Sequence, residues 1–419
     1  MSKVVVTGIG IISSIGNDVV QATESLKNLK HGFALYPPFK PDNVPVKVVG
    51  TIKHFDTTST DQEDWTYPAS YKVKREVMRG LAPHGLYAYC ATQQAIHDSG
   101  LTPEELANPD TGIYTASGGS PFLLHRNMTR MHQYGINRCP PLAIVSSIAG
   151  TLTFNLDAAF GIQGYSCGFV SACASSGHAL GFAMDAIRLG RQKRMVVVGG
   201  EDGNLESILP FAGMRALSPS TDPDTASRPF DRDRNGFVGT GGGVTLVLED
   251  EASALAREAP IHGELAGWGQ SSDGHNVAIS HPDGDGLARA MKMALNDARV
   301  DPGKVDYLNA HAPSTPIGDR SEIRAIRQIF KHGATPAISS TKGITGHALS
   351  MASILEVALS LLAMKGGFMP GSANLVNIDP EAAGLPILKK TRAQPPSLIL
   401  SNSSGFGGAN VALVLRRYP

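Results

Sequence analysis

Short apolar segments alternate with helical patterns along most of the chain, and this alternation predicts an α/β fold. Val4–Thr7, Met195–Gly199 and Val305–Ala310 are continuous apolar runs rather than alternating ones. Such runs are typical of strands that are covered on both faces of a sheet. Patterns of helical period lie between the strands, including Cys173–Leu189 and Leu349–Met364, and they predict helices.

The rest of the chain can be interpreted in the same way. Residues 31–70 are polar, contain proline and lack a period, so we expect a surface excursion there. Tyr71–Ser99 carries one long helical pattern that Gly100 ends, and Val238–Glu249 is interpreted as two short strands around a glycine-rich stretch. The remaining strands are expected at Gly112–Thr115, Ile261–Gly269, Ala337–Ser340, Leu398–Leu400 and Val411–Leu415, and the remaining helices at Asp18–Leu29, at Leu287–Ala298 and before Phe330.

The chain has 419 residues, which is too long for one ordinary core, so we expect two units. Each half contains a buried strand, a polar loop and a largely apolar helix, and each ends near a glycine-rich strand pair. We interpret this as an internal duplication with a seam near residues 250–260, which gives units at 1–255 and 256–419. Two unrelated α/β domains are the alternative.

Composition argues against several classes of protein. Lys plus Arg and Asp plus Glu both number 37, so no global basic field indicates nucleic-acid binding. The 13 histidines show no metal-ligand spacing, and the four cysteines form no Cys-x-x-Cys pair and suit a reducing compartment. We find no signal-peptide h-region and no stretch of about 18 uncharged apolar residues. We therefore expect a cytoplasmic protein without a metal, a membrane or a nucleic acid as partner.

One cysteine is a candidate nucleophile. Cys173 lies in a run of small residues, 170–177, at the start of a predicted helix. A thiol at a helix N-terminus gains thiolate character from the helix dipole, and small neighbours let a substrate reach the sulfur. A buried, inert cysteine is the alternative, and it is the commoner fate of a free cysteine.

Three further segments carry candidate chemistry. His311 ends a buried strand and faces a loop, where open α/β sheets bind ligands. Lys342 and His347 lie in a glycine-punctuated loop before an apolar helix, and Lys342 could pair with Glu356 on that helix. A glycine-rich loop around Phe406 could gate a pocket. A structural histidine, a surface lysine and an ordinary turn are the alternatives when each segment is taken alone.

Together, and in this order, these segments resemble the β-ketoacyl-acyl-carrier-protein synthases of the thiolase superfamily, in their elongating synthase I/II branch. The resemblance runs from the Val-Val-Thr-Gly-x-Gly start at residues 5–10 to Gly-Phe-Gly-Gly-x-Asn at 405–410, and includes Thr115–Ser120 and Arg228–Phe237. It implies a thiolase-like duplicated fold, layered α-β-α-β-α, with two mixed sheets around buried helices. It implies no cofactor, because substrates arrive on the phosphopantetheine of an acyl carrier protein.

The resemblance also implies a mechanism, a decarboxylative Claisen condensation with malonyl-acyl carrier protein that gives a 3-oxoacyl product. Cys173 would receive the acyl group, and the backbone N–H groups of Cys173 and Phe406 would form the oxyanion hole. His311 and His347, as neutral imidazoles, would assist decarboxylation and donate hydrogen bonds to the enolate.

Supporting roles follow from the same resemblance. Lys342 with Glu356 would hold the histidine loop in place, Phe406 would gate the sulfur, and Thr315 would contact pantetheine. The glycine-rich loop would also border the pantetheine, through Ser404, Gly405, Gly407 and Gly408.

The sequence departs from the family pattern where the acyl chain and the pantetheine are expected. The stretch after His311 reads Ala-Pro-Ser-Thr-Pro and lacks one of the usual threonines. Ser350 and Ser353 replace glycines, and Ser404 and Ala409 replace an aromatic residue and a threonine. We expect a non-standard acyl chain, such as an unsaturated or aryl-capped one.

Other classes fit less well. The Gly8–Ser13 segment lacks the third glycine of a dinucleotide loop. A thiolase would carry a second cysteine near the C-terminal glycine loop, and no cysteine follows Cys173. A non-catalytic chain-length-determining partner subunit would lose the nucleophile, so this alternative fits less well than an enzyme.

Partners follow from the implied mechanism. A carrier protein is acidic, so its docking face on the enzyme needs cations. The family implies a homodimer, and a heterodimer with a related ketosynthase-like subunit is the alternative. The candidate docking residues lie on two predicted helical stretches and are Lys72, Lys74, Arg75, Arg79, Arg126 and Arg130.

Overall fold

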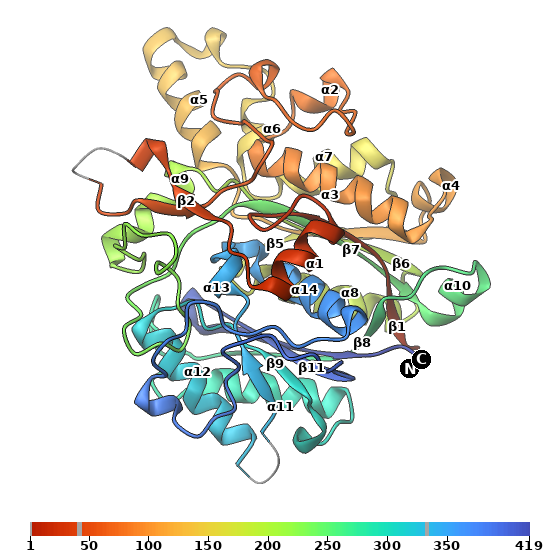
Figure 1. The fold of residues 1–419 in the computed structure, drawn as a ribbon. Coiled ribbons are helices and arrows are strands. Elements are labelled where there is room, and N and C mark those ends of the chain that lie inside the picture. Colours follow the sequence, from red (N-terminus) through yellow and green to blue (C-terminus); the bar gives the residue numbers. More distant parts are fainter. Residues whose placement is uncertain (1, 40–43, 332–334) are drawn as a thin grey trace.

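The computed structural model describes residues 2–39, 44–331 and 335–419. Within this part of the chain, ten strands form one mixed sheet in the order β10-β9-β11-β12-β8-β1-β7-β6-β4-β5, and β2 pairs with β3 separately (Figure 1). The strands are β1 (Val4–Ile12), β2 (Phe33–Leu35), β3 (Val48–Gly50), β4 (Thr111–Ala116), β5 (Ser166–Phe169), β6 (Arg194–Glu201), β7 (Gly242–Asp250), β8 (Gly263–Ser272), β9 (Tyr307–Asn309), β10 (Ala337–Ser339), β11 (Leu398–Gly405) and β12 (Ala409–Arg416).

The large sheet consists of two five-stranded halves with the same topology. In chain order, the strands of the first half are β1, β4, β5, β6 and β7, and those of the second are β8 to β12. Each half places its strands in the order third, second, fourth, fifth, first, with parallel pairs first and antiparallel pairs at the end. The two halves therefore have the topology that an internal duplication would give, and β7 and β8 are connected by residues 251–262.

The halves are joined along a very short contact. β1 pairs with β8 only at Val4–Val6, opposite Gly263–Leu265. Beyond this contact the halves diverge and enclose two helices, which gives the expected α-β-α-β-α layers around a common core (Figure 1). The two sheets implied by the resemblance are thus continuous at one end. The first strand, β1, and the last, β12, flank β8 at that end.

Helices cover the outer faces and fill the middle. α3 packs on β1 and β7, α11 packs on β8 and β12, and α8 and α14 lie between the halves. The α-helices are α1 (Val19–Asn28), α2 (Arg75–Met78), α3 (Pro83–Ser99), α4 (Pro103–Leu106), α5 (Pro121–Tyr134), α6 (Ala143–Ser147), α7 (Thr151–Phe160), α8 (Ser175–Arg188), α9 (Leu205–Ile208), α10 (Glu251–Ala256), α11 (Asp285–Asp297), α12 (Pro316–Ile329), α13 (Lys342–Thr345) and α14 (Ala352–Gly366). The 3₁₀ helices are η1 (Pro37–Phe39), η2 (Gln62–Asp64), η3 (Ile136–Arg138), η4 (Leu209–Met214), η5 (Pro302–Lys304), η6 (Leu349–Met351), η7 (Pro380–Ala382) and η8 (Phe406–Gly408).

Two predicted elements are wrong. The helix expected at Tyr71–Ser99 is divided into α2 and α3, because Pro83 has no N–H to continue a helix and starts a new one instead. The two strands expected at Val238–Glu249 are one strand, β7. Its glycines mark a close approach rather than a break, since a Cβ at Gly243 would lie 2.4 Å from backbone atoms of α3.

The most apolar helix lies at the centre of the fold. Leu349–Gly366, which comprises η6 and α14, has the length and hydropathy of a membrane span, but 89% of it is buried inside the protein. It packs against α8 and β11 in the middle layer. Its composition therefore reflects burial between the two half-sheets.

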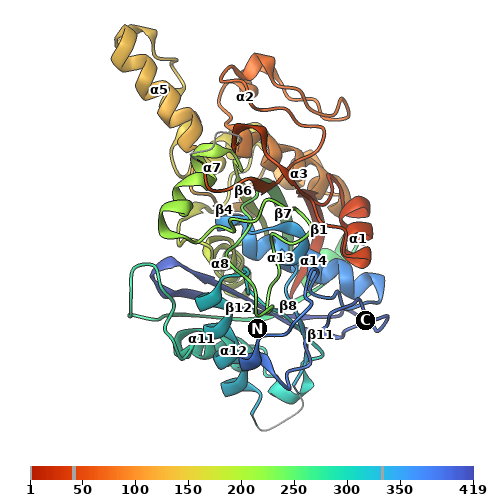
Figure 2. The same ribbon diagram turned by 60° about the vertical axis from the view of Figure 1, so that its left-hand side comes forward.

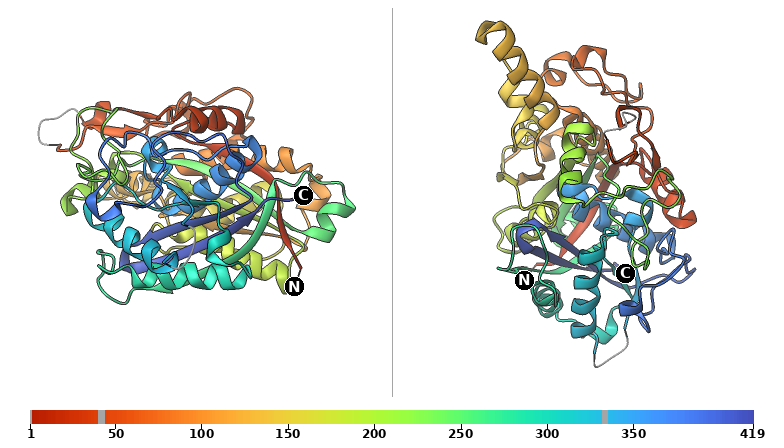
Figure 3. Two further views of the ribbon diagram at one scale, coloured as in Figure 1. Left: turned by 60° about the horizontal axis from the view of Figure 1, so that its bottom comes forward. Right: turned by 90° about the vertical axis from the view of Figure 1, so that its left-hand side faces the viewer.

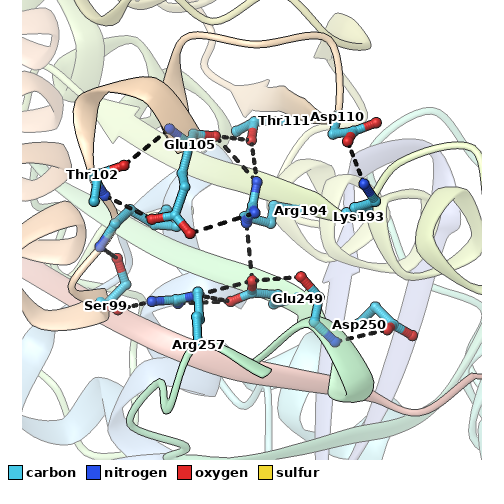
Figure 4. Close-up of polar contacts among 12 residues, drawn as sticks. Ser99, Thr102, Glu105, Asp110, Thr111, Lys193, Arg194, Glu249, Asp250 and Arg257 are labelled. Carbon is cyan, nitrogen blue, oxygen red and sulfur yellow. Dashed lines mark hydrogen bonds and ion pairs between the residues drawn. The ribbon is translucent and has the colours of Figure 1, made fainter. Parts of the chain in front are cut away.

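A buried ion-pair network ties the strands together at the start of β6 (Figure 4). Glu249 of β7, fully buried, accepts from Arg194 Nε at 3.0 Å and from Arg257 Nη2 at 2.7 Å. Arg194 also donates to Thr111 Oγ1, and Arg257 donates to the carbonyl of Ser99. The network thus fixes three strands and α3 at the edge opposite the strand ends that carry the candidate site.

Candidate active site

The three central candidates meet at the carboxyl ends of parallel strands. Cys173 follows β5, His311 follows β9, and His347 lies in the loop after β10. All three side chains line one cavity of about 360 Å³, although they are far apart along the chain. The structure therefore brings the sulfur and the two imidazoles together in an accessible pocket.

The turn that carries Cys173 is held tightly. Ala172, directly before it, adopts a left-handed conformation with φ 51°. Ser175 Oγ accepts from the N–H of Ser171 at 2.8 Å and donates to the carbonyl of Ala172 at 2.6 Å. Gly405 packs directly on this turn, because a Cβ there would lie 2.8 Å from the Ser171 carbonyl and 3.0 Å from Cys173 N. The sulfur is thus presented from a sharp turn between β5 and α8.

The thiol of Cys173 is not an intrinsic thiolate. Burial raises its pKa to about 12, and the nearby Lys342 charge lowers it only in part. Burial therefore opposes the thiolate character expected at a helix N-terminus. The sequence shows the helix start but not the depth at which the sulfur lies, and desolvation is the largest influence on the pKa of this thiol.

His347 contacts the sulfur directly. Its Nε2 lies 3.0 Å from Cys173 Sγ, within hydrogen-bond distance. The backbone N–H of His347 donates to the carbonyl of Val238 at 2.7 Å, and the Phe237 ring meets the imidazole edge-on at 5.1 Å between centroids. These contacts fix the ring beside the thiol, so that it can exchange a proton with the sulfur.

His311 completes the group and, like His347, follows a strand of the second half-sheet, whereas Cys173 follows a strand of the first. Its ring centroid lies 5.2 Å from that of His347, nearly perpendicular to it. Glu322 on α12 holds the loop, because its carboxylate accepts from the N–H of His311 at 2.9 Å and from that of Ala312 at 2.6 Å. The sequence reasoning missed Glu322. Glu322 follows Thr315 and Asp319 at the spacing of one helical face, just after the histidine, and this spacing was the available signal.

Both imidazoles are neutral at physiological pH. Burial lowers the pKa of His311 and of His347 well below the usual range, and the charge of Lys342 acts in the same direction. A neutral imidazole retains one N–H donor and one acceptor nitrogen. The pair therefore has the hydrogen-bonding character that stabilisation of a developing oxyanion needs.

Lys342 and Glu356 form a buried ion pair behind the histidines. Glu356 also accepts from Ser403 Oγ at 3.0 Å, so the pair links α13, α14 and β11. Neither side chain lines the cavity. Their predicted role as a support for the histidine loop agrees with this position.

An aromatic series connects Phe406 to the catalytic group. Phe406 lies 5.7 Å from Phe211, Phe211 lies 5.6 Å from Phe237, and Phe237 contacts His347. Phe211 and Phe406 line the cavity. The sequence reasoning missed Phe211, because η4 follows no strand end or motif that marks it. A movement of Phe406 would therefore be transmitted to the wall beside the histidine.

The remaining loop candidates divide into two groups. Thr315, Ser404 and Gly405 line the cavity, although the Thr315 hydroxyl also caps α12 by accepting from Gly318 N at 3.2 Å. Gly407 and Gly408 do not line it. Both have positive φ and shape the turn, so their role here is conformational.

Comparisons with known proteins agree over the whole chain. Residues 1–254 match the N-terminal domain of β-ketoacyl synthases, and residues 262–376 match the C-terminal domain. The chain is 37% identical to 3-oxoacyl-[acyl-carrier-protein] synthase 1 of Escherichia coli, over 100% of this chain and 99% of the relative. The chain belongs to the β-ketoacyl synthase family.

Solved structures support the assignment of this synthase to the same family. A β-ketoacyl synthase from Burkholderia phymatum superposes with a TM-score of 0.91 at 29% identity, covering all of both chains. AntDE:AntF, a type II polyketide ketosynthase in complex with its acyl-carrier protein and bound to the hexaketide, superposes with a TM-score of 0.88 at 25% identity, again over 100% of both chains. The fold expectation is confirmed by these likenesses.

The candidate docking cations of the synthase gather on one side. α2, α5 and α6 lie together at the top of Figure 1, and α5 projects from the body in Figure 2 and in the right-hand panel of Figure 3. The two lysines precede α2 on irregular chain rather than on the predicted helix. A surface cavity of about 440 Å³ between α2 and α5 is lined by Arg75, Arg79, Arg126 and Arg130.

Two of the synthase's departures from the family pattern lie against the catalytic turn. Ser353 Oγ is 3.4 Å from the carbonyl of Cys173. Ser350 donates, through both its N–H and its hydroxyl, to the buried carboxyl of Glu201 at the end of β6. The serines that replace glycines thus join a polar cluster beside the nucleophile.

Proposed function

We propose that this synthase condenses an acyl thioester held on Cys173 with malonyl-acyl carrier protein to give a 3-oxoacyl-acyl carrier protein. The observation that carries the proposal is the meeting of Cys173 Sγ, His347 and His311 in one cavity. The family membership of the chain supports it.

The acylation step needs a proton acceptor because the thiol is neutral at rest. His347 Nε2 takes the thiol proton as the sulfur attacks the incoming thioester carbonyl. The new sulfur–carbon bond forms, the old one breaks, and the departing pantetheine thiolate receives the proton. The turn at Ala172 and Gly405 keeps the sulfur at the floor of the cavity during this exchange.

Condensation follows on the acyl-enzyme. Malonyl-acyl carrier protein loses carbon dioxide, and the electron pair of the broken bond forms an enolate whose oxygen accepts hydrogen bonds from neutral His311 and His347. The enolate carbon attacks the acyl carbonyl, the carbon–sulfur bond breaks, and the Cys173 thiolate takes up one proton from solvent through His347. His347 thus acts in both half-reactions, whereas His311 acts in the condensation.

Separate half-reaction assays test this scheme. We expect Cys173→Ala to abolish acyl transfer, and His311→Ala to leave an acyl adduct detectable by intact-protein mass spectrometry while condensation falls by at least about 100-fold. Iodoacetamide should label Cys173 and block turnover. A wild-type protein that never forms an acyl adduct, yet increases the activity of a related synthase, would favour the alternative of a non-catalytic partner subunit.

The arginines beside α2 and α5 are the proposed docking site for the acidic carrier protein. Arg75, Arg126 and Arg130 line one cavity, and Glu63 pairs with Arg75 at 2.6 Å and would be displaced by an incoming carboxylate. Charge reversal of Arg126 and Arg130 together should raise KM for acyl-carrier protein about tenfold without affecting a free pantetheine thioester. Reversal of the exposed Arg299 is the control, and equal effects from both changes would contradict this docking site.

We propose a homodimer that forms through β5. Among the described residues, β5 pairs only with β4, so its outer edge is bare, whereas the equivalent strand β10 is bonded on its outer side to residues 386–388. Val170 beside β5 is 66% exposed. An unpaired strand edge with exposed apolar neighbours is a pairing surface.

Sedimentation velocity tests the assembly. Val170→Glu should convert a dimer into a monomer, whereas Leu255→Glu, at a position on α10 that is 54% exposed, should not. A wild-type chain that is monomeric at micromolar concentration, and that associates only when a related subunit is added, would replace the homodimer with a heterodimer.

A further inference from the structure

A second cavity lies on the surface chain that the sequence predicted as a polar excursion. It has a volume of about 710 Å³ and is lined by two segments, the start of α1 at residues 17–21 and the surface chain at residues 54–71. It shares no lining residue with the cavity that holds Cys173. The condensation proposed above therefore leaves this second cavity without a role.

The walls of the second cavity combine negative charge with aromatic rings. Among the described residues no lysine or arginine lines it, and His54 is its basic side chain. Phe55 and Tyr71 lie 6.4 Å apart between ring centroids. Carboxylates and aromatic faces both attract cations. The two carboxylates and three rings of the wall belong to Asp18, Asp56, Phe55, Tyr67 and Tyr71.

The amide of Asn17 adds a hydrogen-bond acceptor without a partner. Asn17 lines the cavity and is only 7% exposed, and among the described residues its Oδ1 has no hydrogen-bond partner. Its Nδ2 donates to the carbonyl of Lys53 at 2.6 Å, and this bond fixes the orientation of the amide. A buried acceptor without a donor costs free energy. A ligand that carries an N–H group would remove this cost.

Asp56 is the carboxylate that is available to a ligand. It is exposed, and the hydrogen bonds from the hydroxyl and the N–H of Thr58 lower its pKa, so it is ionised at neutral pH. Asp18 is instead the N-cap of α1, and its two oxygens accept from the N–H and the side-chain amide of Gln21. The site thus offers one free charge and one buried carbonyl oxygen.

An organic cation matches these walls better than a metal ion does. Among the described residues, no group of three histidine, cysteine, aspartate or glutamate side chains could hold a metal. Aromatic rings instead pack against methylene groups and attract an ammonium group through their faces. A primary ammonium group also carries three N–H donors.

We propose that this cavity binds an alkylammonium group, whose N–H donors reach Asn17 Oδ1 and the Asp56 carboxylate while its methylene groups pack against Phe55. A free aliphatic amine and the lysine side chain of another protein share this chemistry. The inference goes beyond the condensation, because binding requires neither Cys173 nor an acyl group.

Isothermal titration calorimetry of the full chain tests the site. The probes are 1,4-diaminobutane, butane-1,4-diol as its uncharged analogue, and Nα-acetyllysine amide for a lysine side chain. We expect an ammonium probe to bind with a Kd below about 1 mM, at least about tenfold more tightly than the diol. Asp56→Asn and Asn17→Leu should each weaken that binding at least about tenfold. Asp64→Asn is the matched control, because Asp64 is exposed on the same surface chain and accepts from Ser59 Oγ at 2.7 Å, but does not line the cavity.

The results decide both the site and the source of the ammonium group. Tighter binding of the diamine supports a free amine, and tighter binding of the lysine derivative supports a protein side chain. The proposal fails if the diol binds as tightly as the ammonium probes, if neither ammonium probe binds below about 10 mM, or if Asp64→Asn weakens binding as much as Asp56→Asn. Should Asn17→Leu not fold, Asp56→Asn decides, because its position is exposed and the change preserves the size of the side chain.

Discussion

The ion pair between Lys342 and Glu356 gives a quantitative prediction. Both side chains are almost completely buried, and Glu356 has Ser403 as its other side-chain partner. Replacement of Lys342 by methionine leaves the carboxyl of Glu356 buried without its counter-charge, which should lower the free energy of unfolding by about 3–5 kcal/mol at pH 7.5. The additional change Glu356→Gln removes the unpaired charge and should recover most of this loss.

The sign of the pH dependence follows from the state of Glu356. Burial already raises the pKa of this carboxyl, and loss of Lys342 raises it further. A carboxyl whose pKa is higher in the folded state costs no stability below its unfolded pKa, and stability is lost as pH rises toward the folded pKa. Lys342→Met should therefore be closer to wild type at pH 5 than at pH 7.5, whereas the double variant should show no such trend.

Urea unfolding followed by circular dichroism at the two pH values measures these differences. Lys3→Met is the matched control, because Lys3 pairs with Glu251 on the surface at 3.0 Å and its loss should leave the free energy of unfolding nearly unchanged. The reasoning is refuted if Lys342→Met and Lys3→Met cost the same, or if the double variant is less stable than Lys342→Met alone. Slower iodoacetamide labelling of Cys173 should accompany Lys342→Met, since the lysine lowers the thiol pKa.

Three further predictions follow from the candidate active site and from the strands that support it. The rate of Cys173 alkylation should rise about tenfold per pH unit from 7 to 10 without a plateau, because burial keeps the thiol pKa near 12; a plateau below pH 9 would contradict this. Glu249→Ala should lower the free energy of unfolding by about 3–5 kcal/mol, against less than about 1 kcal/mol for Glu251→Ala, and similar values in denaturant titrations would be evidence against the network in Figure 4. Gly405→Ala should lower the rate of Cys173 acylation by at least about tenfold, because its Cβ would press on the backbone of the nucleophile turn; full activity would show that the turn can shift.

Much of the fold could be predicted from local patterns. Continuous apolar runs such as Val305–Ala310 identified most strands, and Leu349–Met364 identified the helix of the middle layer. Errors arose where tertiary contact decided the outcome. The glycines in β7 predict a break when they are considered alone, but α3 requires them for close packing.

In the candidate site, too, some features could be predicted from local sequence and others depended on tertiary contact. The positions of Cys173, His311 and His347 after strands left structural alternatives open when each was taken alone, and the family resemblance of the segments together singled them out. The geometry that unites them agrees with that prediction. The raised pKa of the thiol and the position of Glu201 could not be predicted, because both depend on burial and on strand register between distant segments. Such properties belong to the assembled sheet rather than to any one segment.

The position of the first and last strands on either side of β8 has a consequence for how the protein could be rebuilt. Glu264 of β8 is paired both with Val5 of β1 and with Arg416 of β12, so the first and last strands flank one residue. A short linker from the last residue to the first, with new ends cut between β7 and β8, would exchange the order of the two repeats along the polypeptide. Every pair of neighbouring strands would be preserved, and only the connections between strands would change. Circularly permuted chains of this kind are commonly tolerated when the termini lie at the surface and near each other.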